Sequence, residues 1–258
     1  MGIDLTAVPV GASVQGDSEE RLTELRAQLR ELQLRMVAHG KQLIVLVEGW
    51  EAAGKRDFLR DLGCSLDPCR MRTFVTAAKP DSDEKRHWLA RFWAELPAAG
   101  NSSLFYRSWY RTVIAQKIAG AIDETGLSRG CDEINEFEAQ QCDHDTIMVK
   151  LFFHMSEDEQ ARRLEQRWSD PWMRTITHKR EDNWAEGRAK LIDGWHAVFE
   201  QTDTRWAPWT LVDAEDEKGG RAMALETLVR TLDKALPATP PAAQGDHVVV
   251  QFPATGGR

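Results

Sequence analysis

The most constraining feature of the sequence is a glycine-rich segment, residues 49–55, that separates an apolar run from a charged run. Gly49, Gly54 and Lys55 match the pattern G-x-x-x-x-G-K, and the preceding Leu43–Val47 reads as a buried strand. In such a strand–loop–helix unit the glycines let backbone N–H groups converge on phosphate oxygens. The helix N-terminus adds partial positive charge, and the lysine reaches the terminal phosphates. The pattern therefore predicts a phosphate loop.

The residue after the lysine departs from the usual form of that loop. A Ser or Thr normally stands there and ligates magnesium, whereas this chain has Arg56. The difference disfavours an ordinary nucleotide-hydrolysing P-loop protein. We count Arg56 among the expected phosphate-binding residues.

From residue 42 onward, short β-rich runs alternate with helical stretches, which is typical of an α/β protein with a parallel sheet. Runs that are apolar on both faces indicate strands covered on both sides. We expect five such strands, at residues 42–48, 73–77, 103–106, 147–153 and 209–212.

A long helix is expected before the first strand, from Ser18 to about Gly40. Its apolar residues recur at spacings of three and four, which gives the helix one apolar face. These residues are Leu22, Leu25, Leu29, Leu32 and Met36. The face could pack on the core or pair with a second copy. Packing is favoured because barely two heptads are present.

The two ends of the chain differ in composition from its middle. Residues 1–17 are rich in Gly, Val and Ser without periodicity and predict a flexible leader. Residues 236–258 contain a stretch rich in Pro, Ala and Gly and predict a disordered tail. Val248–Val250 within this tail could add a strand to a sheet edge in a partner. One domain, 18–235, is expected between the two ends.

Charge and cysteine usage limit the partners and the compartment. The net charge of −8 argues against non-specific binding to nucleic acid or anionic membrane, so we expect neither partner. The four cysteines are too few for a disulfide framework, which favours a cytoplasmic location. Cys142 and His144 lie close in sequence, but no second ligand pair indicates zinc.

Two arginines follow the expected strand at residues 103–106. Ligands of such folds bind outside the carboxyl ends of the strands. Arg107 and Arg111 are therefore expected to face the same crevice as Lys55.

A locally basic stretch, about residues 156–190, stands out in this acidic chain. Arg162, Arg163 and Arg167 fall on roughly one side of a helix, and Asp170-Pro171 follows as a turn. This arrangement suits a mobile lid that closes over phosphates. The alternative is an exposed, salt-bridged helix.

Seven ordered motifs, over roughly residues 20–235, resemble the polyphosphate kinase 2 family. They are Gly49–Lys55, Lys79-Pro80, Leu96–Gly100, Arg107–Tyr110, Phe137-Glu138, Glu159–Arg163 and the run from Thr202-Asp203-Thr204 to Ala207-Pro208-Trp209. The resemblance implies a three-layer α/β/α P-loop kinase-like fold with a five-stranded parallel sheet and a helical lid. It also implies a homo-oligomer, a dimer or tetramer, that moves phosphoryl groups between inorganic polyphosphate and a nucleoside mono- or diphosphate with Mg²⁺.

The resemblance also assigns roles to residues. It implies Glu51, Lys55 and Arg107 as catalytic residues, with the Glu51 carboxylate, an aspartate in active members, as the metal ligand. The expected phosphate-binding residues are Gly49, Gly54, Lys55, Arg56, Lys79, Arg107, Arg111, Arg162, Arg163 and Arg167.

Two positions depart from the family pattern. Tyr106 stands where the strand-end, magnesium-binding aspartate is expected, and Gln116 stands where a further acid is expected. In this respect the chain resembles the N-terminal half of tandem members, the half held not to carry the chemistry. Two hypotheses follow: a phosphotransferase whose missing acids are supplied by residues such as Asp57, Asp61 or Glu138, or a non-catalytic polyphosphate- or nucleotide-binding subunit.

Overall fold

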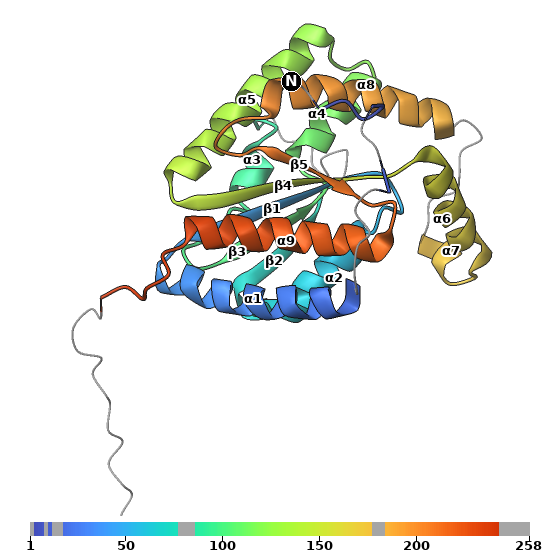
Figure 1. Cartoon of the computed structure of the whole chain (residues 1–258). Coiled ribbons are helices and arrows are strands. Elements are labelled where there is room, and N and C mark those ends of the chain that lie inside the picture. Colours follow the sequence, from blue (N-terminus) through green and yellow to red (C-terminus); the bar gives the residue numbers. More distant parts are fainter. Residues whose placement is uncertain (1–2, 8–9, 12–17, 77–85, 177–183, 243–258) are drawn as a thin grey trace, which may run out of the picture.

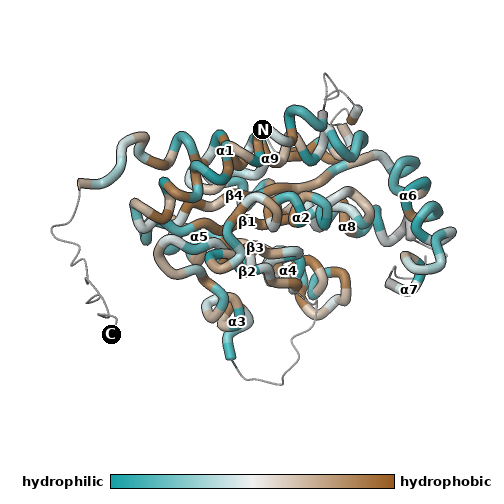
Figure 2. The backbone as a smooth tube through the Cα atoms, turned by 90° about the horizontal axis from the view of Figure 1, so that it is seen from below, coloured by the Kyte–Doolittle hydropathy of each residue, from teal (hydrophilic) through white to brown (hydrophobic). Residues whose placement is uncertain are grey.

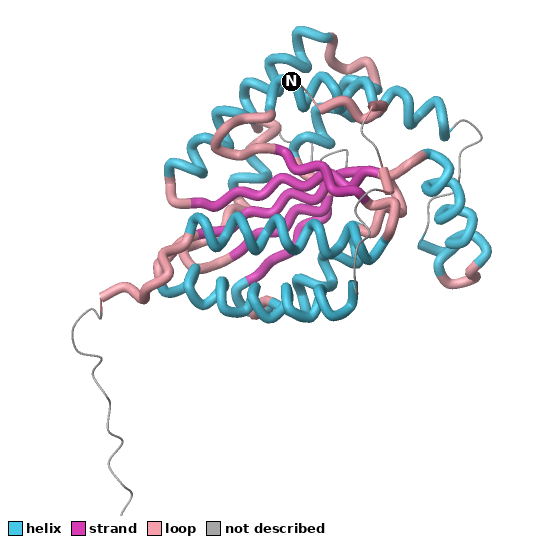
Figure 3. Tube along the Cα trace, viewed as in Figure 1, coloured by secondary structure: helices cyan, strands magenta, loops and turns pink. Residues whose placement is uncertain are grey.

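The computed structural model describes residues 3–7, 10–11, 18–76, 86–176 and 184–242. Within these residues a parallel sheet of five strands forms the centre of the molecule, in the order β2-β3-β1-β4-β5 (Figure 3). The strands are β1 (Gln42–Gly49), β2 (Met71–Val75), β3 (Ser102–Tyr106), β4 (Thr146–His154) and β5 (Trp209–Asp213).

Helices cover both faces of the sheet, which confirms the predicted three-layer α/β/α fold (Figure 1). One face carries α1 (Ser18–Ala38), α2 (Lys55–Ser65) and α9 (Glu217–Ala235). The other face carries α3 (Ala90–Trp93), α4 (Trp109–Ile118), α5 (Glu124–Asp143) and α8 (Trp184–Thr202). Two helices, α6 (Glu157–Ser169) and α7 (Met173–Ile176), project beyond the end of the sheet, and a 3₁₀ turn spans Pro68–Arg70.

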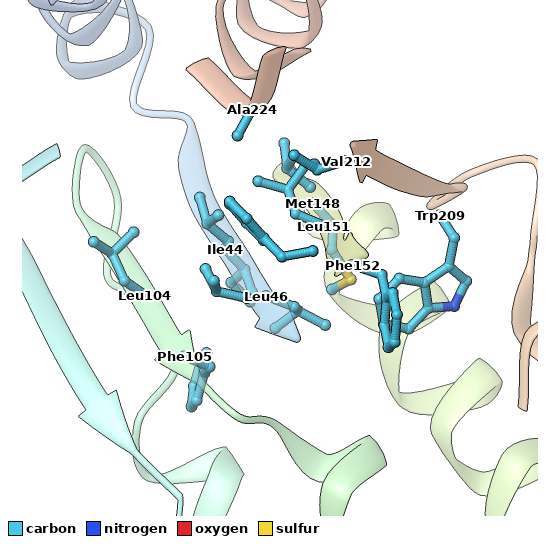
Figure 4. Packing of buried hydrophobic residues seen from close by; sticks show 14 of the residues in the cluster. Ile44, Leu46, Leu104, Phe105, Met148, Leu151, Phe152, Trp209, Val212 and Ala224 are labelled. Atoms are coloured by element: carbon cyan, nitrogen blue, oxygen red, sulfur yellow. The ribbon is translucent and has the colours of Figure 1, made fainter. Parts of the chain in front are cut away.

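The hydrophobic core lies on both faces of the central strand β1. Ile44 and Leu46 are fully buried among side chains of the neighbouring strands, including Phe105 and Leu151 (Figure 4). Removing such side chains from water supplies the main driving force for folding. Because β1 lies between β3 and β4, the loop at its carboxyl end starts from the central strand of the sheet.

The second predicted strand is placed differently from our expectation of a buried strand at residues 73–77. β2 spans Met71–Val75 and is the edge strand of the sheet, next to β3 only. Val75 is 70% exposed. A strand with one neighbour tolerates polar residues such as Arg72. Because Arg72 does not fit the pattern of a buried strand, the strand was predicted to start two residues too late.

The apolar face of α1 is used inside the chain. Leu22, Leu25 and Leu29 are fully buried in the core, and α1 lies beside α9 (Figure 2). Of the two expectations for this face, packing on the core is confirmed. The face is therefore not available for a coiled coil with a second copy.

Residues near both ends of the described chain contact the folded domain, although the sequence predicted a flexible leader and a disordered tail there. Leu5 is buried, and its N–H donates to Nε2 of His196 at 2.9 Å. Leu236 is also buried, and its carbonyl accepts from Arg35 at 2.6 Å. In each case an apolar side chain within a polar segment covers part of the core. The run Val248–Val250 lies outside the described residues.

Candidate functional site

The phosphate loop, residues 49–55, connects β1 directly to α2. Gly49 has φ of 119°, and a Cβ there would lie 2.2 Å from the carbonyl oxygen of Phe153 on β4. Gly54 has φ of 81° and is the N-cap of α2. Both positions need glycine, the first for close approach and the second for its left-handed backbone. The first N–H groups of α2 have no partners within the helix, which makes this end suited to anions.

Lys55 is buried, and its ammonium group is turned onto the loop itself. It donates to the carbonyl of Gly49 at 2.6 Å and to that of Trp50. Burial lowers the pKa of Lys55 to about 8. The ammonium is thus held where a phosphate chain would meet the helix N-terminus, bonded to groups that phosphate oxygens can replace.

Glu51 lies at the centre of a ring of cations. Its carboxylate oxygens lie 3.3 Å from the Arg107 guanidinium and 3.8 Å from that of Arg167. Burial alone would raise the pKa of the Glu51 carboxyl, but the surrounding positive charges outweigh burial and lower it. These charges belong to Lys55, Arg107, Arg167 and Arg56. Glu51 is therefore an ionised carboxylate that already has ion-pair partners.

Arg107 reaches the site from a strained turn at the end of β3. Its φ is 61°, a left-handed conformation that costs a non-glycine residue about 1–2 kcal/mol. The turn is fixed by Glu48, which accepts hydrogen bonds from the backbone N–H of Ser108 at 2.5 Å and from its hydroxyl at 2.8 Å. Burial raises the pKa of Glu48. These bonds aim the Arg107 side chain at Glu51.

Two more predicted phosphate-binding arginines lie in the same place. Burial lowers the pKa of Arg111, and the charges that act on it belong to Glu48, Arg107 and Glu51. Arg56, at the start of α2, lies with its guanidinium 5.6 Å from the ring centre of Tyr106. The structure thus brings together Glu51, Lys55, Arg56, Arg107 and Arg111, as the sequence predicted.

The three arginines of α6 do not share one role. Arg167 reaches Glu51, whereas Arg162 is exposed and pairs with Glu159 at 2.6 Å. Arg163 is buried and donates to the carbonyls of Ala214 and Glu215, at 2.9 and 2.8 Å. Arg163 fastens the base of α6 to the start of the β5–α9 connection, which corrects the expectation that it faces phosphates. The sequence shows only that these arginines share one side of a helix. Their different roles follow from how deeply each side chain is buried in the folded chain.

The acids proposed to replace the missing ones lie away from the loop or have other partners. Asp61 pairs with Arg26 and Arg221, and Glu138 is fully buried beside Lys150. Asp57, in the first turn of α2, pairs with Arg60. Gln116 lies on α4 and is half-buried. Lys79 and residues 177–183 of the expected lid lie outside the described residues.

The described residues of the site do not fit a magnesium ion held by protein ligands. Among the described residues, no three or more His, Cys, Asp or Glu side chains gather where they could hold a metal. Of the two carboxylates at the loop, Glu48 fixes the Arg107 turn and Glu51 is ion-paired. Tyr106 at the end of β3 is neutral, and burial raises its pKa further. Magnesium usually needs one or two free carboxylates besides substrate phosphates.

Sequence reasoning missed the groups that hold the loop from behind. The indole N–H of Trp50 donates to Nδ1 of His154 at 2.9 Å, and the Arg188 guanidinium lies 4.2 Å from the centre of the Trp50 ring. Gln160 on α6 donates to the Glu51 carbonyl at 3.3 Å. In this region the sequence offered one signal of such a hidden contact. Glu48 is an acid inside an apolar strand, and a buried carboxylate needs a hydrogen-bond partner.

Comparison with known proteins agrees with this geometry. Residues 13–240 match the family model described as Polyphosphate kinase 2. A polyphosphate:AMP phosphotransferase of Pseudomonas syringae pv. tomato is 36% identical, over 78% of this chain and 40% of its own length. ADP-polyphosphate phosphotransferase 2 of Rhizobium meliloti is 30% identical, over 82% of this chain and 69% of its own.

A solved structure shares the fold along nearly the whole chain. The crystal structure of polyphosphate kinase 2 from Arthrobacter aurescens superposes with a TM-score of 0.81 at 27% identity, and the match covers 95% of this chain and 90% of that one. The chain spans less than half the length of the polyphosphate:AMP phosphotransferases it matches. On the family match and the shared fold, this chain belongs to the polyphosphate kinase 2 family.

Proposed function

We propose that the chain is a polyphosphate-dependent phosphotransferase, which moves a phosphoryl group between inorganic polyphosphate and a nucleoside mono- or diphosphate. The observation that carries the proposal is the ring of Lys55, Arg107 and Arg167 around Glu51, at the start of α2. The relatives named above act on polyphosphate with AMP or ADP. A cationic phosphate loop in this family supports the same class of reaction here.

The chain's own cations carry most of the proposed mechanism. Phosphoryl transfer requires little covalent chemistry from the protein, so positioning and charge neutralisation supply most of the rate. Lys55 and Arg107 neutralise oxygens of the transferring phosphoryl group, while Arg56, Arg111 and Arg167 hold the rest of the polyanion. In the free protein Glu51 keeps Arg107 and Arg167 in place, and phosphate oxygens then share these cations.

The remaining expectations about cofactor, partners and location are part of this proposal. Kinases of this family are generally magnesium-dependent, and the assay below therefore includes magnesium. We propose polyphosphate and a nucleotide as ligands, a homo-oligomer, and a cytoplasmic location. Among the described helices, none is long and apolar enough to cross a bilayer, and all four cysteines are free.

A transfer assay tests the function directly. Wild-type protein is incubated with polyphosphate, magnesium and AMP, ADP or GDP in turn, and the phosphorylated nucleotide is measured. We expect measurable transfer that is slower than the range of about 1–100 per second usual for kinases, because Tyr106 offers magnesium no carboxylate. Lys55→Ala should weaken polyphosphate binding at least tenfold, about 1.4 kcal/mol. Lys41→Ala, which removes an ion pair with Asp145 at the other end of β1, is the matched control and should change nothing.

Absence of transfer with every nucleotide would overturn the proposal. If polyphosphate still binds in that case, the chain is the alternative, a non-catalytic polyphosphate-binding subunit. If Lys55→Ala binds as tightly as the wild type, the phosphate loop is not the binding site.

A further inference from the structure

Among the described residues, cations outnumber carboxylates around Glu51 and Tyr106 in the phosphate-loop site. In the part of the chain that the structure describes, the carboxylates of Glu48 and Glu51 lie next to these cations and both have partners within the chain, and Glu217 on α9 lies beside Gly54. The cations of the site are Lys55, Arg56, Arg107, Arg111 and Arg167. A site built for a metal-bound phosphate presents acids to the metal, and this one presents an excess of cations to the phosphate itself.

Tyr106 lies next to three of these cations. Its side chain is buried at the end of β3, and three cations lie over its ring: the Lys55 ammonium at 5.6 Å from the ring centre, the Arg56 guanidinium at 5.6 Å and that of Arg107 at 5.5 Å. Each distance is within the range of about 6 Å over which the negative face of an aromatic ring attracts a cation. The ring thus gathers the cations without supplying a charge that would pair with them.

An aspartate at this position would act in the opposite way. Its carboxylate would pair with one or two of these cations and leave them less available to phosphate. It would also offer magnesium a ligand that a neutral phenol does not replace. With Tyr106 at this position, the site lacks a metal ligand, and the neighbouring cations have one carboxylate fewer to pair with.

We propose that this phosphate loop takes polyphosphate as the metal-free polyanion, with the Tyr106 ring holding Lys55, Arg56 and Arg107 toward it where an acid would hold a metal. The inference rests on the proposed function in that it names the form in which the polyphosphate substrate binds. Magnesium on the polyphosphate then competes with the protein's cations for the same oxygens. Magnesium should weaken binding of the polyphosphate rather than support it.

Titration calorimetry of the full chain with sodium polyphosphate of one defined length tests this. The titration is run with EDTA and again with millimolar MgCl₂, at equal ionic strength so that general screening is the same. We expect the affinity in EDTA to equal or exceed that in magnesium. An affinity at least tenfold weaker in EDTA would overturn the inference, and this comparison needs no variant.

Two variants then test the role of the ring. Tyr106→Phe keeps the aromatic face and should bind within about twofold of the wild type in EDTA. Tyr106→Asp should lose at least tenfold in EDTA and recover part of that loss when magnesium is added. Equal, undiminished binding of both variants in EDTA would show that the ring does not organise the cations, which overturns its assigned role.

The failure of this inference and the failure of the proposed function give different results. Transfer activity together with binding that requires magnesium would leave the function standing and overturn the metal-free mode. Metal-free binding without transfer to any nucleotide would leave the metal-free mode standing and overturn the proposed function.

Discussion

Two clusters of charged and aromatic residues in this protein come from neighbouring motifs yet are built on opposite plans. In the core between β4, α4 and α5, Lys150 and Glu138 are both fully buried and lie 2.9 Å apart. At the phosphate loop, five cations of the described residues lie around the carboxylates of Glu48 and Glu51. The first cluster matches each charge with a partner, and the second leaves positive charge in excess.

The buried cluster satisfies its polar groups completely. Glu138 accepts from the indole N–H of Trp109 at 2.9 Å and from the hydroxyl of Tyr110 at 2.6 Å. Lys150 also donates to the Thr202 carbonyl at 2.8 Å. Burial raises the pKa of Tyr110 well above its ordinary value, so the phenol remains a donor. Buried networks of this kind hold a fold in one arrangement and offer nothing to a ligand.

The comparison teaches how to separate motif residues that build the fold from those that bind the substrate. Trp109, Tyr110 and Glu138 belong to the family motifs, but their polar atoms all have partners in the core. Arg107, two residues before Trp109, faces the loop instead. Whether the charges of a cluster are matched within the protein separates fold-building residues from substrate-binding ones. Membership of a motif does not separate them.

Breaking the buried pair should give the largest effect. Glu138→Gln leaves the Lys150 charge buried without a counter-ion and should lower the free energy of unfolding by about 3–5 kcal/mol, measured by urea denaturation. Adding Lys150→Met removes the unpaired charge and should recover part of the loss. Polyphosphate affinity of the folded Glu138→Gln protein should not change.

The control is a pair of the same charges on the surface. Arg21 and Glu24 on α1 are 43% and 55% exposed, and Glu24→Gln should cost no more than about 0.5 kcal/mol. A loss below about 1 kcal/mol for Glu138→Gln would show that the buried pair does not stabilise the fold as argued.

The sequence was sufficient to predict the elements that depend on local pattern. Glycine spacing between a strand and a helix gave the phosphate loop, and the alternation of strands and helices gave the parallel sheet. The edge strand β2 was placed too late because its exposed residues, such as Arg72, do not have the pattern of a buried strand. Local pattern does not indicate which strand lies at the edge.

The site was predictable only in part, for a related reason. Lys55 and Arg107 follow strands whose carboxyl ends must meet, so topology alone brought them together. The roles of Arg163 and Glu138 depend on burial and on partners distant in the sequence, Ala214 and Lys150. From their charges alone, Arg163 was expected to contact phosphate and Glu138 to replace a missing acid. In the folded chain both residues have partners inside the protein.

Helix α6 allows the comparison to be sharpened within one element. Arg167 faces Glu51 across the loop, whereas Arg162 is 63% exposed and pairs with Glu159. Arg167→Ala should lower polyphosphate affinity about tenfold, and should reduce the slope of log affinity against log salt by about 1, by analogy with nucleic acids. Arg162→Ala should stay within about twofold with the slope unchanged. Equal effects of both variants would mean that α6 binds polyphosphate along its outer face.

The smallest expected effect concerns the strained turn that aims Arg107. Because its φ is 61°, Arg107→Gly relieves backbone strain that Arg107→Ala retains, and both variants lose the guanidinium. Arg107→Gly should therefore be more stable than Arg107→Ala by about 1 kcal/mol, while both bind polyphosphate equally weakly. At Arg162, inside α6, the order should reverse, because glycine costs a helix about 1 kcal/mol relative to alanine. Urea denaturation of the four variants measures both differences. If alanine is the more stable residue at both positions, the turn at Arg107 is not strained, and the bonds from Ser108 to Glu48 are not needed to hold it.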